Sequence, residues 1–219
     1  MKVLFLILYI AVSILHLAAS WRDDAAARRK TKPFLLILLL LYYLFAAPKV
    51  SVLLVLALLT SWLGDVLLIP KGNKWFTLGG IAFMFSHLFF VLVYSSRITL
   101  SRVNLPLVLL LAALYFGVSL FIIRKIRDNT PKAMVAPMYF YLICNSTMNI
   151  FAMMQLMSRP SLAAAVAYVG AVLFFVSDCS LFLVRYSKKP EIIFKKHFTV
   201  MLTYLLGELL IVVGVLMLK

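Results

Sequence analysis

Two aspartates, Asp65 and Asp178, lie within long apolar stretches of this chain. An ionisable group in the hydrocarbon of a membrane costs on the order of 3 kcal/mol on insertion scales, so such an acid indicates a functional site. Two buried acids that share a cavity tend to divide into one protonated and one ionised group. That pair can act as a general acid and as a general base or stabilising anion. The two aspartates therefore point to acid–base hydrolysis or to proton transport.

Other polar side chains recur at helical spacing in the apolar stretches. Tyr141 and Asn145 lie four residues apart, as do Tyr204 and Glu208, so each pair shares one face of a helix. A polar stripe within a membrane span must face protein or water. Besides the aspartates, the predicted substrate-binding or proton-relay residues are Lys32, His87, Tyr141, Asn145, His197, Tyr204 and Glu208.

Several of these residues also have a purely structural explanation. His87 is explained as well by a hydrogen bond to a backbone carbonyl as by a role beside an aspartate. Glu208 is expected near mid-bilayer, where it either contacts His87 or is a buried protonated acid that donates a hydrogen bond. Lys32 either contacts a lipid phosphate or extends to the membrane surface as an ordinary basic flank. The sequence leaves these alternatives open.

The elements that must position these residues are membrane-spanning helices. The chain is 65% hydrophobic and 13% charged, and a soluble core of 219 residues could not bury so much apolar surface. Runs of about 20 apolar residues cross a bilayer as helices. The predicted spans are 3–19, 33–47, 50–69, 77–95, 104–123, 133–157, 162–184 and 197–218. We therefore expect an all-α bundle of eight transmembrane helices that forms a single integral membrane domain over residues 1–219.

The prolines support these boundaries. Seven of them are expected in loops or at span ends, where no helical hydrogen bond is lost. These are Pro33, Pro48, Pro70, Pro106, Pro131, Pro160 and Pro190. Only Pro137 falls inside a predicted span. The loops between the spans are too short to hold a soluble catalytic module or a nucleic-acid-binding face.

The net charge of +15 is a topology signal in a membrane chain. The loops after the first, third, fifth and seventh spans carry 5, 2, 4 and 5 basic residues, which is 16 of the 22 in the chain. Basic loops face the cytoplasm, so both termini are expected outside. The bias fits a bacterial inner membrane or the endoplasmic reticulum equally well. Cleavage of residues 1–20 as a signal peptide would leave Arg22–Lys32 outside, against this bias, so the first span is expected to remain.

The aspartates occupy corresponding positions in the two halves of the chain. Each lies in the third span of its half, so their helices run in the same direction, from outside to cytoplasm. At a rise of 1.5 Å per residue, Asp65 lies about 6 Å and Asp178 about 9 Å from the cytoplasmic end of its span. The two acids are therefore predicted at similar depth in the cytoplasmic half of the bundle.

These motifs resemble the YhhN-type lysoplasmalogenases, which are eight-span membrane enzymes. The resemblance covers nearly the whole chain. The matching motifs are Lys32-Pro33, Ser61-x-x-Gly64-Asp65-x-x-Leu68, Gly79 through Phe83 to His87 and Tyr94, Gly170 through Ser177-Asp178, and Tyr204. The chain departs from the family at Glu208, where members tend to carry Gln.

The resemblance implies hydrolysis of the vinyl ether bond of lysoplasmalogens, which releases a fatty aldehyde and a glycerophospho-head group. This reaction needs an acid, an anion and water, and no cofactor. The hypothesis is that one of Asp65 and Asp178 delivers the proton while the other stabilises the cation. The expected partners are a lysophospholipid, water and membrane lipids, with no nucleic acid.

Two other functions use the same residues. A proton-coupled transporter would use the acids as relays, although transporters often show inverted repeats and helices broken at mid-membrane. A metal-dependent lipid hydrolase would need three convergent ligands, and Asp65, His87, Asp178 and His197 supply enough candidates. No local ligand spacing supports such a metal site.

Overall fold

The computed structural model describes residues 1–218, and these residues form eight α-helices and no strand. The helices are α1 (Lys2–Trp21), α2 (Ala25–Ala46), α3 (Val52–Leu67), α4 (Asn73–Ser95), α5 (Leu105–Ile126), α6 (Lys132–Ser158), α7 (Leu162–Tyr186) and α8 (His197–Met217). Short 3₁₀ turns lie at Leu100–Arg102, Arg127–Asn129 and Pro190–Ile192. The predicted all-α fold is confirmed for the described residues.

Five of the helices are long and apolar enough to cross a membrane: α1, α4, α5, α7 and α8. The chain is therefore a multi-pass membrane protein. Helix α3 is also apolar but has only 16 residues. Helix α2 begins with a basic segment, and α6 carries Asn145, Asn149 and Gln155 among its buried residues. The count of eight crossings stays a prediction.

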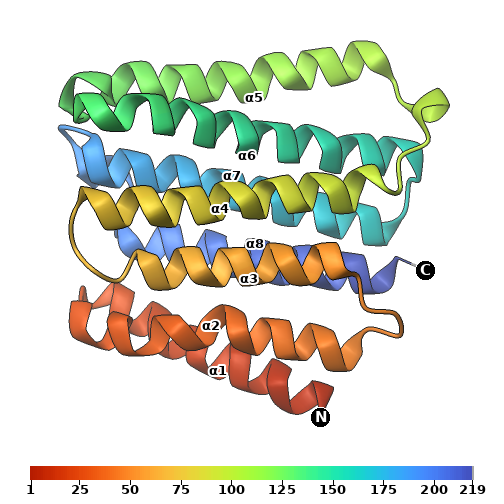
Figure 1. Cartoon of the computed structure of the whole chain (residues 1–219), viewed down its shortest axis with the longest axis horizontal. Helices are drawn as coiled ribbons and strands as arrows, with labels where there is room; N and C mark the ends of the chain where they lie inside the picture. The colour runs from red at the N-terminus through yellow and green to blue at the C-terminus, as the bar shows by residue number, and fades with distance from the viewer. Residues whose placement is uncertain (219) are drawn as a thin grey trace.

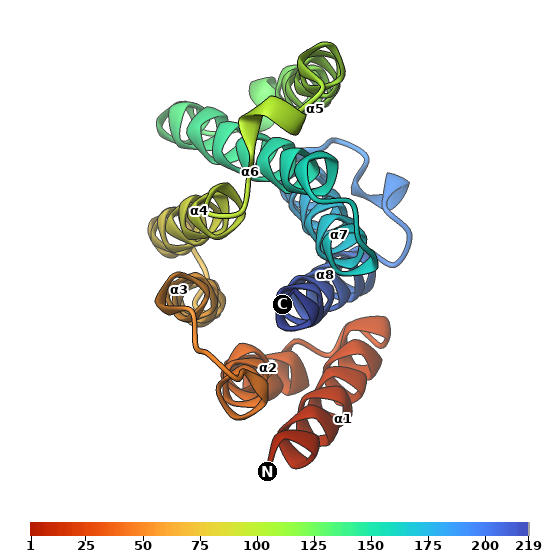
Figure 2. The same ribbon diagram turned by 90° about the vertical axis from the view of Figure 1, so that its right-hand side faces the viewer.

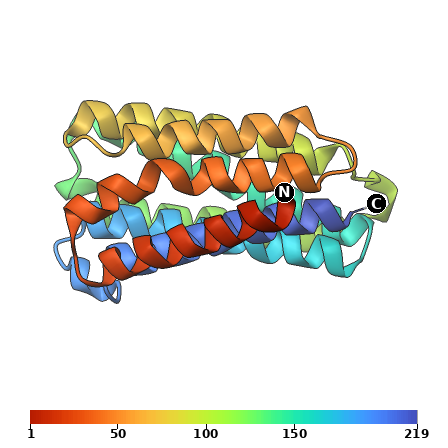
Figure 3. The ribbon, with the colours of Figure 1, turned by 90° about the horizontal axis from the view of Figure 1, so that it is seen from below.

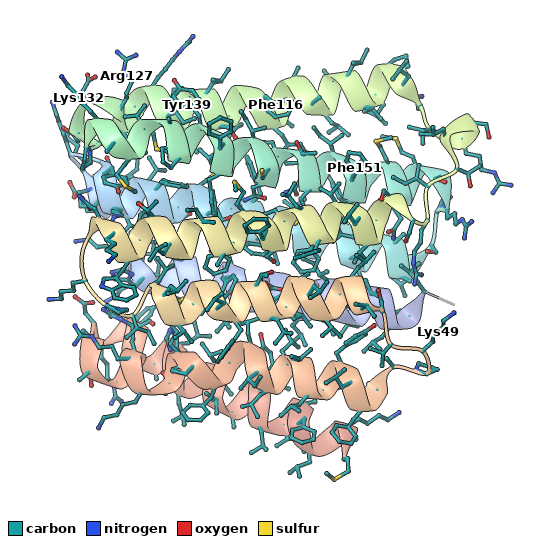
Figure 4. All side chains as sticks on the ribbon, in the orientation of Figure 1. Lys49, Phe116, Arg127, Lys132, Tyr139 and Phe151 are labelled. Atoms are coloured by element: carbon teal, nitrogen blue, oxygen red, sulfur yellow. The ribbon has the colours of Figure 1, made fainter. Side chains whose placement is uncertain are left out.

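The eight helices lie side by side and alternate in direction (Figure 1). The loops α1–α2, α3–α4, α5–α6 and α7–α8 lie at one end, which we call the basic end because these loops carry most of the Lys and Arg. Both termini lie at the opposite end. Figure 4 shows Arg127 and Lys132 at the basic end and Lys49 at the other. The side of the membrane that each end faces stays a prediction.

Viewed along the helices, α3 and α4 stand opposite α7 and α8 (Figure 2). Helix α6 contacts both α4 and α7, and α5 lies beyond it at the edge. Helix α1 packs on α2 and runs obliquely beneath α8 (Figure 3). Its Tyr9 is buried and donates a hydrogen bond of 2.7 Å to the backbone carbonyl of Leu205. The polar side chains of α3, α4, α7 and α8 can therefore meet inside the bundle.

Helix α2 begins eight residues before the predicted span, at Ala25 rather than Pro33. Asp24 caps it, because its Oδ1 accepts hydrogen bonds of 3.0 Å from the backbone N–H groups of Ala26 and Ala27. The expectation that no helical hydrogen bond is lost at Pro33 was wrong, since Pro33 lies inside the helix. An apolar run marks only the hydrocarbon-facing part of a helix, whereas a capped helix continues into the charged interface.

Glycines allow the central helices to approach closely. A Cβ atom at Gly170 of α7 would lie 2.6 Å from the backbone oxygen of Gly207 on α8. A Cβ atom at Gly64 of α3 would lie 2.5 Å from the ring of Phe83 on α4. Small residues at such contacts are a common means of helix association in membranes. These two contacts bring the helices that carry the aspartates close to α4 and α8.

Candidate active site

Asp65 and Asp178 are both buried and line one cavity of about 160 Å³, which we call the acid cavity. Helices α3 and α7, which carry them, run in the same direction (Figure 1), as predicted. The charged and titratable lining of the cavity consists of Lys32, Asp65, Asp178, Arg185, His197 and Tyr204. Arg185 and His197 lie at helix ends near the basic end of the bundle. The two acids therefore lie together near the basic end of the bundle, as the sequence predicted.

Asp65 has a cationic partner. The Nζ atom of Lys32 lies 3.2 Å from its Oδ1, and the hydroxyl of Tyr204 donates a hydrogen bond of 2.9 Å to its Oδ2. A buried carboxylate needs such compensation, because leaving a charge unpaired away from water is very unfavourable. Lys32 reaches Asp65 from within α2, which the early start of that helix makes possible. This environment suits the ionised form of Asp65.

Asp178 has a different set of partners. The Nδ2 atom of Asn145 donates a hydrogen bond of 2.7 Å to its Oδ2. The Nε2 atom of His87 lies 3.3 Å from the same oxygen, but without the alignment of a hydrogen bond. Among residues 1–218, no Lys or Arg forms an ion pair with Asp178. The two acids therefore share a cavity while differing in their compensating charge.

The partners of Asp178 are themselves held in place. The Nδ2 atom of Asn149 donates a hydrogen bond of 3.1 Å to the Oδ1 of Asn145, which leaves the Asn145 amide nitrogen to face Asp178. The His87 ring lies 5.2 Å from the Tyr141 ring and 4.9 Å from the Phe174 ring, measured between centroids. Tyr141 thus borders the site, beside both His87 and Asp178.

Glu208 belongs to a separate buried cluster. The hydroxyl of Ser61 donates a hydrogen bond of 2.7 Å to its Oε1, and Ser61 also lies 2.7 Å from the hydroxyl of Ser86. The suggested contact between Glu208 and His87 is not formed, because His87 faces Asp178 instead. Ser61 and Ser86 lie close to Asp65 and His87 in sequence but point towards α8. Glu208 is completely buried and does not line the acid cavity.

This arrangement makes the hydrogen-bond acceptor at position 208 more important than its charge. We expect Glu208→Gln to keep the unfolding temperature of the protein in detergent, because the amide oxygen can still accept from Ser61. Glu208→Leu should lower stability by about 1–3 kcal/mol, since it removes the buried acceptor of the Ser61 hydroxyl. Thermal unfolding of both purified variants tests this prediction. An equal loss of stability in the two variants would show that the carboxylic acid itself is required.

A second cavity of about 240 Å³ adjoins the acid cavity at the basic end, and we call it the basic pocket. Its polar lining consists of His16, Arg28, Arg29, Lys32, Lys71 and His197. Lys32 and His197 line both cavities. The sequence reasoning expected a basic cytoplasmic rim to hold a lipid phosphate, but it did not identify Arg28, Arg29 and Lys71 as the side chains that form it. A signal was present in the second turn of α2, where basic residues precede Lys32.

A comparison with protein families matches the YhhN family over residues 27–215. The chain belongs to the YhhN family. This match confirms the resemblance on which the sequence analysis drew, and it spans the whole acid cavity and every predicted site residue of this YhhN-family protein. Comparisons with curated proteins and with solved structures found no match.

The four residues considered as metal ligands do not form one group. Among residues 1–218 of this YhhN-family protein, no three His, Cys, Asp or Glu side chains converge in a way that could hold a metal ion. His87 lies beside Asp178, whereas His197 lines both the acid cavity and the basic pocket. Of the predicted residues, the structure brings Lys32 and Tyr204 to Asp65, and His87 and Asn145 to Asp178.

Proposed function

We propose that this YhhN-family protein hydrolyses the vinyl ether bond of lysoplasmalogens, releasing a fatty aldehyde and a glycerophospho-head group. The observation that carries the proposal is that two buried acids with different partners line one cavity, which adjoins a pocket of basic side chains. Family membership supports it, because the resemblance to YhhN-type lysoplasmalogenases implies this activity.

In the proposed reaction, Asp178 is the general acid. Its carboxyl group donates a proton to the β-carbon of the vinyl ether, and the double bond becomes an oxocarbenium ion with its positive charge shared between oxygen and the α-carbon. Asp178 suits this role because it lacks an ion pair with Lys or Arg among the described residues. Asn145 binds only its Oδ2, so Oδ1 can carry the proton.

Asp65 is the anion in this proposal. Lys32 and Tyr204 stabilise its carboxylate, which lines the same cavity as Asp178. The carboxylate stabilises the oxocarbenium ion and accepts a proton from the water that attacks the α-carbon. The resulting hemiacetal then breaks its bond to the glycerol oxygen, which takes the hydroxyl proton, and the aldehyde leaves. Proton exchange from Asp65 to Asp178 restores the starting state and completes the consumption of one water.

The basic pocket suits the phosphate of the lipid head group in this proposal. Arg29 and Lys71 carry positive charge there, as does Arg28, whose Nη1 also pairs with Asp23 at 2.7 Å. Guanidinium groups bind phosphate with well-matched geometry. Lys32 lies between this pocket and Asp65, so it can contact both the phosphate and the catalytic anion. A head group held in the basic pocket would place the adjoining vinyl ether at the acids.

A panel of single-chain lipids tests the proposed function. We expect the purified protein in detergent to release aldehyde from a vinyl ether lysophosphatidylethanolamine and to leave the alkyl ether and acyl forms intact. Neither the alkyl ether nor the acyl lipid has a vinyl ether double bond to protonate, so neither can release an aldehyde by this route. Vectorial transport has no meaning in micelles, so turnover there also separates hydrolysis from proton-coupled transport. Fatty acid release from the acyl lipid, or no aldehyde from the vinyl ether, would refute the proposal.

A further inference from the structure

A third cavity, of about 430 Å³, lies between α4, α6 and α7, and we call it the apolar groove. Its lining includes Phe76, Met84, Met134, Met138, Tyr141 and Phe182. Apart from the hydroxyl groups of Thr77, Tyr141 and Tyr186, the side chains that line it are apolar. The Thr77 hydroxyl donates to the backbone oxygen of Asn73 within its own helix, so it offers little to a polar ligand. This groove suits a hydrocarbon chain.

The apolar groove borders the acid cavity. Phe76 lines both cavities, and its ring packs edge-to-face against Phe182, with 6.1 Å between centroids. Tyr141 lines the groove and packs against His87, which contacts Asp178. A chain in the groove would therefore end beside the side chains that surround the acids.

Charge changes along these three cavities in one direction. The basic pocket shares Lys32 with the acid cavity, and the acid cavity shares Phe76 with the apolar groove. The guanidinium carbon of Arg185 lies 3.9 Å above the Phe76 ring, at the point where the lining changes from charged to apolar. Phosphate, linking bond and hydrocarbon chain follow each other in the same order in a single-chain phospholipid. A single apolar groove also matches a lipid that has a single hydrocarbon chain.

We propose that the apolar groove binds the hydrocarbon chain of a single-chain phospholipid and sets the chain length that the protein prefers. The identity of the lipid rests on the proposed function, whereas the chain site rests on the groove. Gly80 of α4 is the position where the groove can be filled. A Cβ atom there would meet only the Tyr141 ring, at 3.9 Å, which is ordinary contact. A larger side chain at Gly80 can therefore enter the groove without displacing backbone.

The test uses a photoreactive probe that does not depend on turnover. The probe is a lysophosphatidylethanolamine with a saturated ether chain that carries a terminal diazirine. In the detergent-solubilised protein, we expect it to label the groove segments of α4 and α6, residues 76–84 and 134–141. Gly80→Phe should abolish this labelling. Gly117→Phe is the matched control, because Gly117 lies on α5 and a Cβ there would meet no atom within 4 Å.

Chain-length preference is the second measurement. With vinyl ether lipids of graded length, we expect Gly80→Phe to shift the preferred substrate to shorter chains, while Gly117→Phe keeps the wild-type preference. Ala136→Phe fills the groove from α6 and should produce the same shift, so the test does not depend on the folding of one variant. Size-exclusion profiles and unfolding temperatures identify variants that are folded.

The outcomes separate the chain site from the proposed function. Groove labelling by a wild-type protein that releases no aldehyde would support the chain site and refute the lysoplasmalogenase activity. Labelling elsewhere by a protein that does release aldehyde would overturn the chain site alone. The chain site would also be overturned if folded Gly80→Phe and Ala136→Phe proteins kept the wild-type labelling and the wild-type chain-length preference.

Discussion

Asp178→Asn is expected to fold normally and to lose aldehyde release by about 10²–10⁴-fold, the usual contribution of a general acid. Asparagine has nearly the same shape as aspartate, and its amide oxygen can still accept the hydrogen bond from Asn145. It cannot supply an acidic proton to the vinyl ether carbon. Aldehyde release in detergent, measured beside the unfolding temperature, tests both parts of this prediction.

Asp65→Asn should abolish activity in the same way but should also lower stability. Removing one partner of a buried ion pair leaves the other charge uncompensated, at a cost of up to about 3–5 kcal/mol. Lys32 is that partner, at 3.2 Å. The double variant Lys32→Met/Asp65→Asn should recover the unfolding temperature without recovering activity.

Wild-type turnover in a folded Asp178→Asn or Asp65→Asn protein would contradict the two-acid mechanism. Glu208→Gln serves as the matched control, because it removes a third buried acid that does not line the acid cavity. We expect that variant to retain turnover. Loss of turnover in all three variants, with wild-type unfolding temperatures, would indicate that the acids act together rather than in the two roles assigned here.

Gly170→Leu is expected to destabilise the bundle severely and to remove activity with it. A Cβ atom at Gly170 would lie 2.6 Å from the backbone oxygen of Gly207 and 2.7 Å from the backbone nitrogen of Ile211. Backbone atoms cannot rotate away, so α7 and α8 must separate. Overpacking usually lowers the free energy of unfolding by about 1–3 kcal/mol. Because Gly170→Leu forces two helices apart, we expect a loss at or above the upper end of that range. Separating the two helices would also move Asp178 on α7 away from Tyr204 on α8, and both residues line the acid cavity.

The unfolding temperature and the monodisperse fraction in detergent measure this effect. Gly117→Leu is the matched control, because it adds the same side chain to a helical glycine that has open space around it. It should keep or slightly raise stability, since Gly is about 1 kcal/mol less favourable than Ala in a helix interior, and Leu is close to Ala. Equal unfolding temperatures for the two variants would show that close α7–α8 packing does not stabilise the bundle.

Helix positions could be predicted well from apolar runs, because a membrane span must satisfy its own backbone hydrogen bonds. The same runs predicted the start of α2 poorly. Its first two turns are charged, and they are helical because Asp24 caps them, which hydropathy does not detect. Pro33 was therefore placed at a boundary that the helix passes through. That extension is what brings Lys32 into the bundle beside Asp65.

The sequence by itself determined the all-α membrane class, the clustering of basic residues in alternate loops, and the identity of the two aspartates as site candidates. These properties follow from composition and from the free-energy cost of an acid in hydrocarbon. They can be inferred without knowing which side chains contact each other. Only the tertiary structure decided which side chains contact each other. The resulting pairs are Lys32 with Asp65, Asn145 with Asp178, and Ser61 rather than His87 with Glu208. Helical periodicity gives the face on which a polar side chain lies, but the packing of neighbouring helices decides which side chain meets it there.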